Sequence, residues 1–305
     1  MTAGHRSLEV PVEAAGMRLD VWLAGALDLP RTKVKALLDR GAVRIGGRPP
    51  RKGDRTIAGA RVEVTLETED PRPVPQPELP LAVLHVDPQL VAVDKVAGMP
   101  SHPLEPGERG TVVNALVARY PECAGASEDP REGGLVHRLD TLTSGVLLAA
   151  RDPAAWRSVR DAFTERRVEK LYLAVVTGPV ADAGDIDLPL RHRGDHVEPA
   201  LGGGGREALT GFRVLSRSGD AALLEVRIQT GVLHQIRAHL AAIGAPVLGD
   251  VAYGGRTHPG LGRFFLHAAF LGLAHPVSGD RLEVRAPLPG ALVDVLAALG
   301  LGGVD

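Results

Sequence analysis

The spacing of apolar residues near the N-terminus predicts two short helices followed by two strands. Over residues 18–27 the apolar positions recur at the period of an amphipathic helix; they are Leu19, Trp22, Leu23, Ala26 and Leu27. A second helix is expected over residues 32–39, and Gly41 can end it by adopting the left-handed conformation. Short strands over residues 43–45 and 61–66 would complete a small α/β module.

Beyond residue 80 the pattern changes to short apolar runs separated by glycine and proline. Such runs, which predict strands, cover residues 90–93, 145–149, 171–176, 222–228 and 282–284. Helices are expected over residues 154–166, 234–243 and 292–299. We therefore expect an α+β fold in which a mixed, mainly antiparallel sheet carries flanking helices.

A proline-rich stretch separates the two regions. Residues 67–80 contain five prolines, and proline both fixes the backbone angle φ and lacks an amide donor. The stretch therefore predicts an extended, semi-rigid linker. It divides the chain into a domain of residues 1–66 and a larger domain of residues 81–305.

The composition is that of an ordinary globular protein, with 44% hydrophobic and 24% charged residues among 305. A single cysteine, Cys123, excludes a disulfide scaffold and a thiolate-bound metal cluster. The N-terminus has no apolar signal segment, and no apolar run approaches the ~20 residues that span a bilayer. We therefore expect a cytoplasmic protein without a membrane partner, and a monomer.

Positive charge is concentrated in the first region. Residues 17–66 hold eleven Lys or Arg against five Asp or Glu, a local charge of +6 in a chain whose net charge is −2. An arginine-rich coding bias would explain the preference for arginine, but not this clustering. The asymmetry favours a nucleic-acid-binding module. The side chains expected to meet phosphates are Arg31, Lys33, Lys35, Arg40 and Arg44.

The densest cluster of reactive side chains precedes the strand expected at residues 145–149. It contains His137, Arg138, Asp140 and Thr143. A loop carboxylate beside an arginine and hydroxyl groups can be held ionised and directed outward, as a nucleophile or general base requires. An aspartate that only closes a turn through backbone amides is the more common alternative. The residue types alone leave both interpretations open.

The run GLVHRLDTLTSGVLLAAR (134–151) resembles the signature of the RluA family of RNA pseudouridine synthases. Further segments resemble other motifs of that family, in the family's order; they are residues 85–103, 168–178, 206–215, 230–254 and 264–289. Residues 17–54 resemble an S4 domain, the small RNA-binding module that often precedes this catalytic domain. The resemblance and the charge pattern therefore point to the same class of partner, an RNA.

The resemblance implies an isomerase that needs no metal and no cofactor. Such an enzyme breaks the N1–C1′ bond of a uridine in structured RNA, turns the uracil and rejoins it through C5. The family's essential aspartate aligns with Asp140, which would attack C1′ or assist removal of a ribose proton. Tyr172 aligns with the tyrosine that packs on the flipped-out uracil and is a candidate for proton handling at C5; Arg138 aligns with the arginine that replaces the base in the RNA. Further substrate-binding candidates are His137, Thr143 and Arg237.

The resemblance leaves the RNA substrate open; we expect ribosomal RNA, with transfer RNA as the alternative. Two positions depart from the family pattern. Val96 stands where a proline is usual, and a second departure lies where the family reads Thr-Gly-Arg before His-Gln-Ile-Arg. The resemblance implies that this arginine pairs with the essential aspartate, and here Val232 takes its place. We expect another cation to replace it, either Arg237, Arg138 or Lys170. The alternative is an RNA-binding relative with impaired or lost catalysis. Lys170 and Lys95 are also candidates for phosphate or ion-pair contacts, with a solvated position as the alternative.

Overall fold

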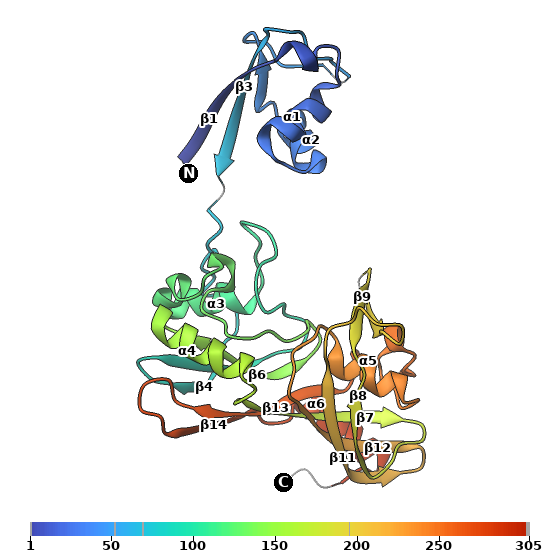
Figure 1. Cartoon of the computed structure of the whole chain (residues 1–305). Coiled ribbons are helices and arrows are strands. Elements are labelled where there is room, and N and C mark those ends of the chain that lie inside the picture. Colours follow the sequence, from blue (N-terminus) through green and yellow to red (C-terminus); the bar gives the residue numbers. More distant parts are fainter. Residues whose placement is uncertain (1, 52, 69, 195, 303–305) are drawn as a thin grey trace. The chain divides into compact units, whose positions relative to one another are not determined.

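The computed structural model describes residues 2–51, 53–68, 70–194 and 196–302. It contains two compact units, Met1–Asp70 and Pro71–Asp305 (Figure 1). Some positions discussed above lie outside the described residues: Lys52 of the basic cluster, Glu69 of the expected linker, and the ends of the expected domains at residue 1 and residues 303–305.

Within the described residues, the smaller unit packs two α-helices against a three-stranded antiparallel sheet of order β1-β3-β2. Its elements are β1 (Thr2–Glu9), the 3₁₀ turn η1 (Val12–Ala14), α1 (Leu19–Leu27), α2 (Arg31–Asp39), β2 (Val43–Ile45) and β3 (Arg61–Thr68). The two helices and two strands expected here are confirmed, and their apolar faces form one core around Trp22, Leu23 and Val64. The sequence pattern does not predict β1, because its residues 4–7 are all exposed and show no alternation.

The larger unit is built on a nine-stranded sheet in the part of the chain that the structure describes. The strands of this unit are β4 (Ala82–Val86), β5 (Leu90–Lys95), β6 (Ser144–Ala150), β7 (Glu169–Thr177), β8 (Ala183–Asp187), β9 (Leu190–Arg193), β10 (His196–Pro199), β11 (Leu209–Ser218), β12 (Ala221–Ile228), β13 (Leu266–Ala274) and β14 (Arg281–Arg285). Its helices are α3 (Val112–Arg119), α4 (Pro153–Thr164), α5 (Gln235–Ala242) and α6 (Gly290–Leu299), with the 3₁₀ turns η2 (Pro121–Gly125), η3 (Pro130–Glu132) and η4 (Val251–Tyr253).

The strand order of the large sheet is β4-β5-β6-β13-β7-β12-β11-β8, with β14 beside β13. Among the described strands of this sheet, only β6 and β13 pair in parallel; the other pairs are antiparallel. The expected mixed, mainly antiparallel sheet is therefore confirmed. The hairpin of β9 and β10 stands apart from this sheet and packs against α5.

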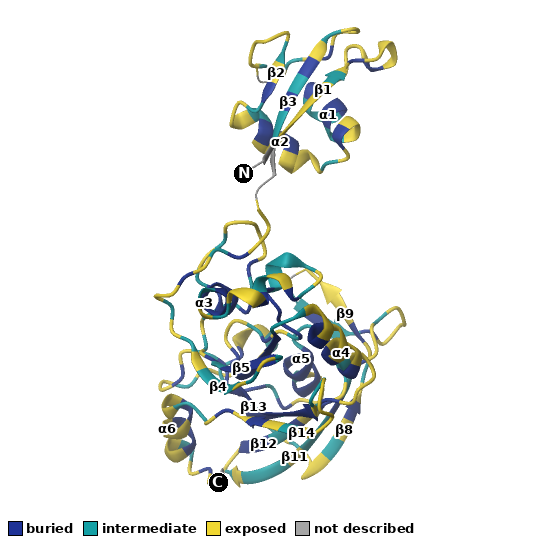
Figure 2. Cartoon of the chain, turned by 90° about the vertical axis from the view of Figure 1, so that its left-hand side faces the viewer, coloured by how far each residue is buried: buried dark blue, intermediate teal, exposed yellow. Residues whose placement is uncertain are grey.

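Inner strands of the sheet are buried on both faces along most of their length, as Figure 2 shows for β5 and β13. Every residue of β6 is buried, and its side chains alternate between two apolar cores. This explains why the sequence there is a continuous apolar run. The outer strand β8 alternates between exposed and less exposed residues instead.

The three helices expected in the larger unit are confirmed as α4, α5 and α6, with ends shifted by one or two residues. Asp152 caps α4 by accepting hydrogen bonds from the amides of Ala154 and Ala155. Helix α3 is not predicted, because its residues 112–117 are all buried and so show no polar face.

Part of the expected linker belongs to the larger unit. The Gln76 amide donates to the Asn114 carbonyl at 2.9 Å, and the Gln76 side chain accepts from the Gly110 amide at 2.6 Å. Asn114 Nδ2 donates to the Val74 carbonyl at 2.8 Å. Residues 74–76 therefore lie fixed on the N-terminal end of α3.

Across the described helices, none has the length and apolar character required to cross a bilayer.

Candidate functional site

Asp140 lies in the turn that leads into β6, and hydrogen bonds hold the backbone on both sides of it. Ser101 Oγ donates to the Leu139 carbonyl at 2.8 Å and accepts from the Leu139 amide at 3.1 Å. The Thr143 amide donates to the Asp140 carbonyl at 3.0 Å, which closes the turn. The carboxylate is therefore presented from a fixed segment of backbone.

Lys95 braces the same turn from inside the protein. Its Nζ donates to the Thr141 carbonyl at 2.9 Å and to the Val96 carbonyl at 3.1 Å. The residue is only 1% exposed, and this burial, reinforced by the charge of Arg263, lowers the pKa of Lys95 to about 7. The predicted roles of Lys95 in phosphate or ion-pair contacts are therefore wrong, and so is the solvated alternative.

Arg263 and Gly145 join the turn to the neighbouring strand β13. Arg263 donates to the Leu142 carbonyl at 2.7 Å and to Ser144 Oγ at 2.9 Å. Gly145 has a φ of +115°, and a Cβ at this position would lie 2.1 Å from the Ala268 carbonyl oxygen. Only glycine permits this close approach of β6 to β13.

The carboxylate of Asp140 forms an ion pair with Arg237, whose Nη1 lies 3.1 Å from Oδ2. The same guanidinium donates to both oxygens of buried Asp250, at 2.6 and 2.9 Å. It also stacks on two rings, with Cζ 4.3 Å from the Phe264 centroid and 4.8 Å from the Tyr253 centroid. Burial alone would lower the pKa of Arg237, but Asp250 and Asp140 raise it above its ordinary value.

The structure thus identifies Arg237 as the cation that reaches Asp140 in this chain. The expectation that a cation at a position other than 232 reaches Asp140 is confirmed, and Arg237 is the candidate that does so. Val232 is 8% exposed and packs with Leu190 and Val197 in an apolar cluster. Gln235 secures this loop, because its Oε1 accepts from the Val232 amide at 3.1 Å.

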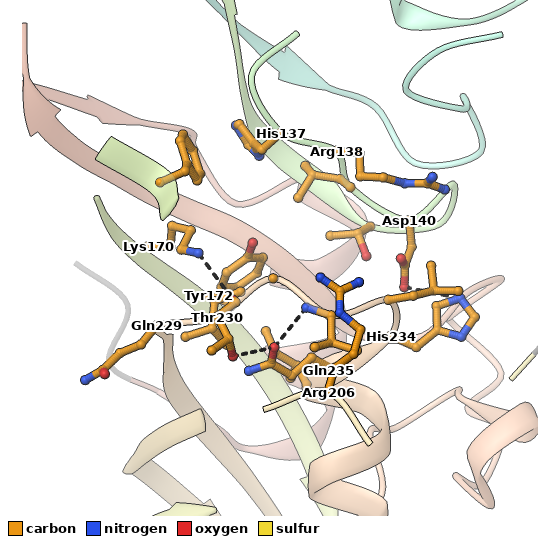
Figure 3. Close-up of a pocket in the computed structure, with 18 of the residues that line it drawn as sticks. His137, Arg138, Asp140, Lys170, Tyr172, Arg206, Gln229, Thr230, His234 and Gln235 are labelled. Carbon is orange, nitrogen blue, oxygen red and sulfur yellow. Dashed lines mark hydrogen bonds and ion pairs between the residues drawn. The ribbon is translucent and has the colours of Figure 1, made fainter. Parts of the chain in front are cut away.

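His234 precedes α5 and faces the same carboxylate, with Nε2 3.8 Å from Asp140 Oδ2 (Figure 3). Its φ is +53°, a left-handed backbone conformation that residues other than glycine rarely adopt. Nδ1 lies 3.0 Å from the hydroxyl of Tyr253. Burial lowers the pKa of His234, although the nearby Asp140 opposes the shift.

Tyr172 and Lys170 project from β7 into the same pocket. Tyr172 is 7% exposed, and burial together with the charge of Asp140 raises its pKa well above the ordinary value. Lys170 donates to the Thr230 carbonyl at 3.3 Å and lies over the Phe163 ring. Its burial lowers the pKa of Lys170 to about 8. The two side chains therefore differ: the phenol stays protonated at neutral pH, whereas the amine is partly neutral at slightly alkaline pH.

The remaining predicted residues of the motif occupy different parts of the wall. His137 stacks on Phe163 and accepts a hydrogen bond from the Leu148 amide at 3.1 Å. Burial lowers the pKa of His137 to about 3, with Lys170 acting in the same direction. Thr143 is 2% exposed, whereas Arg138 is exposed at the rim. Of these three side chains, Arg138 is therefore the one that solvent, or a large ligand, reaches directly.

These side chains line one pocket of about 920 Å³ (Figure 3). Its basic lining residues are Arg138, Arg160, Arg166, Lys170, Arg206 and Arg237, against the acidic residues Glu132, Asp140 and Glu207. The volume is at the upper end of the range of about 300–1,000 Å³ for small-molecule sites. No group of three or more His, Cys, Asp or Glu side chains that could hold a metal ion occurs among the described residues.

The predicted RNA-binding residues of the smaller unit are exposed; they are Arg31, Lys33, Lys35, Arg40 and Arg44. Arg31 is engaged by Asp20 at 2.7 Å, and Arg18 pairs with the same carboxylate at 2.9 Å. Hydrogen bonds from Arg18 and Arg31 hold the pKa of Asp20 well below its usual range. Part of the local positive charge is therefore balanced within the unit.

Sequence reasoning did not identify Asp250, Tyr253, Ser101 or Arg263 as parts of the site. Asp250 and Tyr253 lie in the segment LGDVAYG (248–254), inside a motif that resembles the family. The signal was available, since a polar pair three residues apart in an otherwise apolar or glycine-rich segment has to find partners when it is buried.

Comparison with known proteins agrees with this geometry. The family model described as RNA pseudouridylate synthase matches residues 89–242. An uncharacterized RNA pseudouridine synthase of Chloroflexus aurantiacus is 43% identical over 302 residues, which cover 98% of this chain and 95% of the relative. The ribosomal large subunit pseudouridine synthase D of Xanthomonas campestris is 36% identical over 96% of this chain and 92% of its own length.

Solved structures show the same fold for the larger part of the chain. The human RNA pseudouridylate synthase domain containing 4 superposes with a TM-score of 0.59 at 27% sequence identity. The match covers 73% of this chain and 95% of that one. The family model does not extend into the smaller unit, so its likeness to an S4 domain stays a prediction.

Proposed function

The chain belongs to the RluA-type RNA pseudouridine synthases, and we propose that it isomerises uridines of large-subunit ribosomal RNA with Asp140 as the essential carboxylate. The substrate is supported by the 36% identity, over nearly all of both chains, to the Xanthomonas campestris protein. The reaction is an isomerisation, so its atoms balance without a co-reactant. The N1–C1′ bond breaks, the C5–C1′ bond forms, and the proton lost from C5 balances the one gained at N1.

The ion pair of Asp140 with Arg237 is the observation that carries this proposal. A guanidinium at 3.1 Å stabilises the carboxylate anion. Attack on C1′ and removal of a ribose proton both require that anion. The braced turn supports either route, because it holds the carboxylate at one position in the pocket.

Tyr172 is assigned to packing against the flipped-out uracil. It lies on β7 within the same pocket, and its raised pKa makes it a poor base at neutral pH. This favours the packing role over removal of the C5 proton. A base inside a helix is out of reach of a pocket, so the uridine has to leave its stack, which costs a few kcal/mol. The exposed Arg138 is suited to enter the space that the base leaves.

The smaller unit is proposed to bind RNA through phosphates. Its exposed Lys33 and Lys35 lie on α2, and the relatives match the chain over this unit too. Since no base-reading arrangement is needed for phosphate contacts, this surface would add affinity and leave the choice of uridine to the pocket.

The competing hypothesis, an RNA-binding relative without catalysis, rested on Val232. Its support is weakened because Arg237 supplies the charge that Val232 cannot. The transcript experiment described next distinguishes this hypothesis from catalysis.

The test uses the purified full chain and unmodified transcripts of large-subunit ribosomal RNA and of transfer RNAs. Chemical mapping of pseudouridine should detect product at discrete sites of the ribosomal transcript, and none with Asp140→Asn. Product confined to transfer RNA would overturn the substrate assignment. Binding without product in any transcript would establish the non-catalytic alternative.

A further inference from the structure

Two side chains at the start of α5 converge on one oxygen of Asp140. Arg237 Nη1 lies 3.1 Å from Oδ2, and His234 Nε2 lies 3.8 Å from the same oxygen. His234 directly precedes α5 and Arg237 lies in its first turn, so the start of this helix brings both side chains to the carboxylate. No residue in the described chain forms a hydrogen bond with Oδ1. The two oxygens of Asp140 are therefore unequal before any substrate binds.

The turn η4 supports each of these two side chains from behind. Asp250 accepts from Arg237, and the hydroxyl of Tyr253 lies 3.0 Å from His234 Nδ1. The Val197 amide, on the hairpin of β9 and β10, donates to that hydroxyl at 3.0 Å. The His234 ring is thus held by two elements that take no direct part in the contact with Asp140.

The partners of the Tyr253 hydroxyl favour one tautomer of His234. The Tyr253 oxygen already accepts from Val197, so its single proton is directed to His234 Nδ1. Nδ1 then acts as the acceptor, and the proton of the neutral ring lies on Nε2. Nε2 is the atom that faces Asp140.

The backbone of His234 is unusual for its place. A residue that precedes a helix normally has an extended conformation, whereas His234 has a φ of +53°. A left-handed backbone is unfavourable for a residue with a Cβ and persists where the surroundings enforce it, often at functional sites. The side chain of His234 contacts the Tyr253 hydroxyl and faces the carboxylate of Asp140.

We propose that His234 is a positioning residue for the reaction: its Nε2–H, directed by Tyr253, binds Oδ2 of Asp140 and leaves Oδ1 to react with the ribose. The contact of 3.8 Å in the free protein shortens to a hydrogen bond when RNA fills the pocket. The inference rests on the proposed role of Asp140. In this arrangement Arg237 supplies the positive charge beside the Asp140 carboxylate, and His234 sets the orientation of that carboxylate.

The first experiment compares His234→Gln with His234→Leu in the full chain, under single-turnover conditions with ribosomal RNA transcript. Glutamine retains an N–H donor near the position of Nε2, whereas leucine has a similar size and no donor. Both place a Cβ side chain in the same left-handed backbone. The leucine variant should lower the rate constant about 10- to 100-fold with unchanged RNA affinity, as loss of a hydrogen bond to a charged group does. The glutamine variant should recover most of the rate.

A second experiment uses Tyr253→Phe and the pH profile of the same rate constant. Without the hydroxyl, Nδ1 of His234 can take up a proton, and an imidazolium on Oδ2 weakens the nucleophile. The rate of this variant should therefore fall as the pH decreases, at a pH below the ordinary histidine pKa of about 6.5 because burial lowers the pKa of His234, while the unsubstituted protein shows no such fall. The charged or titratable groups that face His234 are Asp140, Arg237, Asp250, His196 and Tyr253. Tyr120→Phe, which leaves these groups unchanged, is the control.

Two results would overturn the inference: equal rates for His234→Leu and the unsubstituted protein, or parallel pH profiles for Tyr253→Phe and that protein. Equally slow glutamine and leucine variants would assign His234 a purely structural role and overturn it too. These outcomes require an active unsubstituted protein. If that protein forms no pseudouridine, the proposed function fails instead, and the two failures are distinct.

Discussion

The cations around the Asp140 turn and the cations on α2 differ in what surrounds them. Lys95 is 1% exposed and the Arg237 side chain 7%, and both donate to fixed partners inside the larger unit. On α2 the Arg31 side chain is 61% exposed, and Lys33 and Lys35 also face solvent. Buried charges interact strongly with a few neighbours, whereas exposed charges are screened by water and salt.

Buried and exposed cations therefore serve different purposes in this protein. In the larger unit, Arg237 holds the carboxylates of Asp140 and Asp250, and Lys95 holds the backbone of the Asp140 turn, so single substitutions have large effects. On α2 the charges act together on an RNA ligand. Each residue therefore contributes little to the binding free energy, and their combined contribution depends on the salt concentration.

The largest expected effect is that of removing the anion on which the buried cations act. Asp140→Asn keeps the shape of the side chain but can act neither as nucleophile nor as base. Pseudouridine formation should fall by more than about a thousandfold, measured by mapping or tritium release, with little change in RNA affinity. Substantial product from a verified Asn variant would show that the pocket works without this carboxylate.

The next effect tests whether Arg237 acts through its partners. Arg237→Met leaves buried Asp250 unpaired and should lower the free energy of unfolding by about 3–5 kcal/mol. Adding Asp250→Asn should restore part of that stability but little activity, because Asp140 still lacks its cation. The control is Arg213→Met, which breaks an exposed pair with Glu225 and should cost less than about 1 kcal/mol. If the double variant regains activity, Arg237 is a structural residue only.

A smaller effect concerns the free energy of unfolding at acid pH, which should decrease more in the larger unit than in the smaller one. His137 and His267 have pKa values lowered by burial to about 3 and about 4, below the 6.5 of a free histidine. Their uncharged forms stabilise the fold fully above pH 6.5, and this contribution is lost as the pH falls towards the folded values. Each histidine should remove about 1.4 kcal/mol of unfolding free energy per pH unit below 6.5.

The two tryptophans make this measurable in each unit. Trp22 lies in the core of the smaller unit, and Trp156 in that of the larger one. Between pH 6.5 and 5.5, the fluorescence midpoint of denaturant unfolding should fall more for the Trp22→Phe variant, which reports the larger unit, than for Trp156→Phe. An equal decrease of the midpoint in both variants would mean that the buried histidines do not dominate the pH dependence of stability.

The smallest expected effect comes from α2. Lys33→Ala with Lys35→Ala should weaken RNA binding by about tenfold or less, and should lower the slope of log affinity against log salt by roughly 1–2. Adding Arg31→Ala should change the slope less than either lysine, because Asp20 already balances Arg31. Arg217→Ala with Arg256→Ala removes two paired surface charges and serves as the control. An unchanged slope in the lysine variant would exclude α2 as the binding surface.

The sequence predicts elements with one buried face well and others poorly. Helix α4 has a cap at Asp152 and a clear apolar stripe around Trp156 and Val159, so its ends are nearly correct. Helix α3 is buried nearly all round and residues 4–7 of strand β1 are all exposed, so neither shows a period. Periodicity reports a contrast between two faces, and these elements have none.

The site was predictable where its residues form a local motif. Asp140 and Arg138 lie in one run, and Arg237 was one of three cations expected to reach the carboxylate. Asp250 and Tyr253 escaped because their partners lie 13 and 19 residues away and meet them only after folding. Lys95 was misjudged because a lysine on a strand end is usually solvated, whereas here it meets carbonyls of the Asp140 turn.

The hydrogen bonds that brace the Asp140 turn also imply an order of events during synthesis of the chain. Arg263 bonds to Leu142 across 121 residues, and His267 to Ser144 across 123. A ribosome therefore releases Asp140, Tyr172 and Arg237 well before β13 can join β6, and long-range pairing of this kind is slow. Until that strand arrives, a growing chain carries the reactive side chains without the geometry that makes them work together.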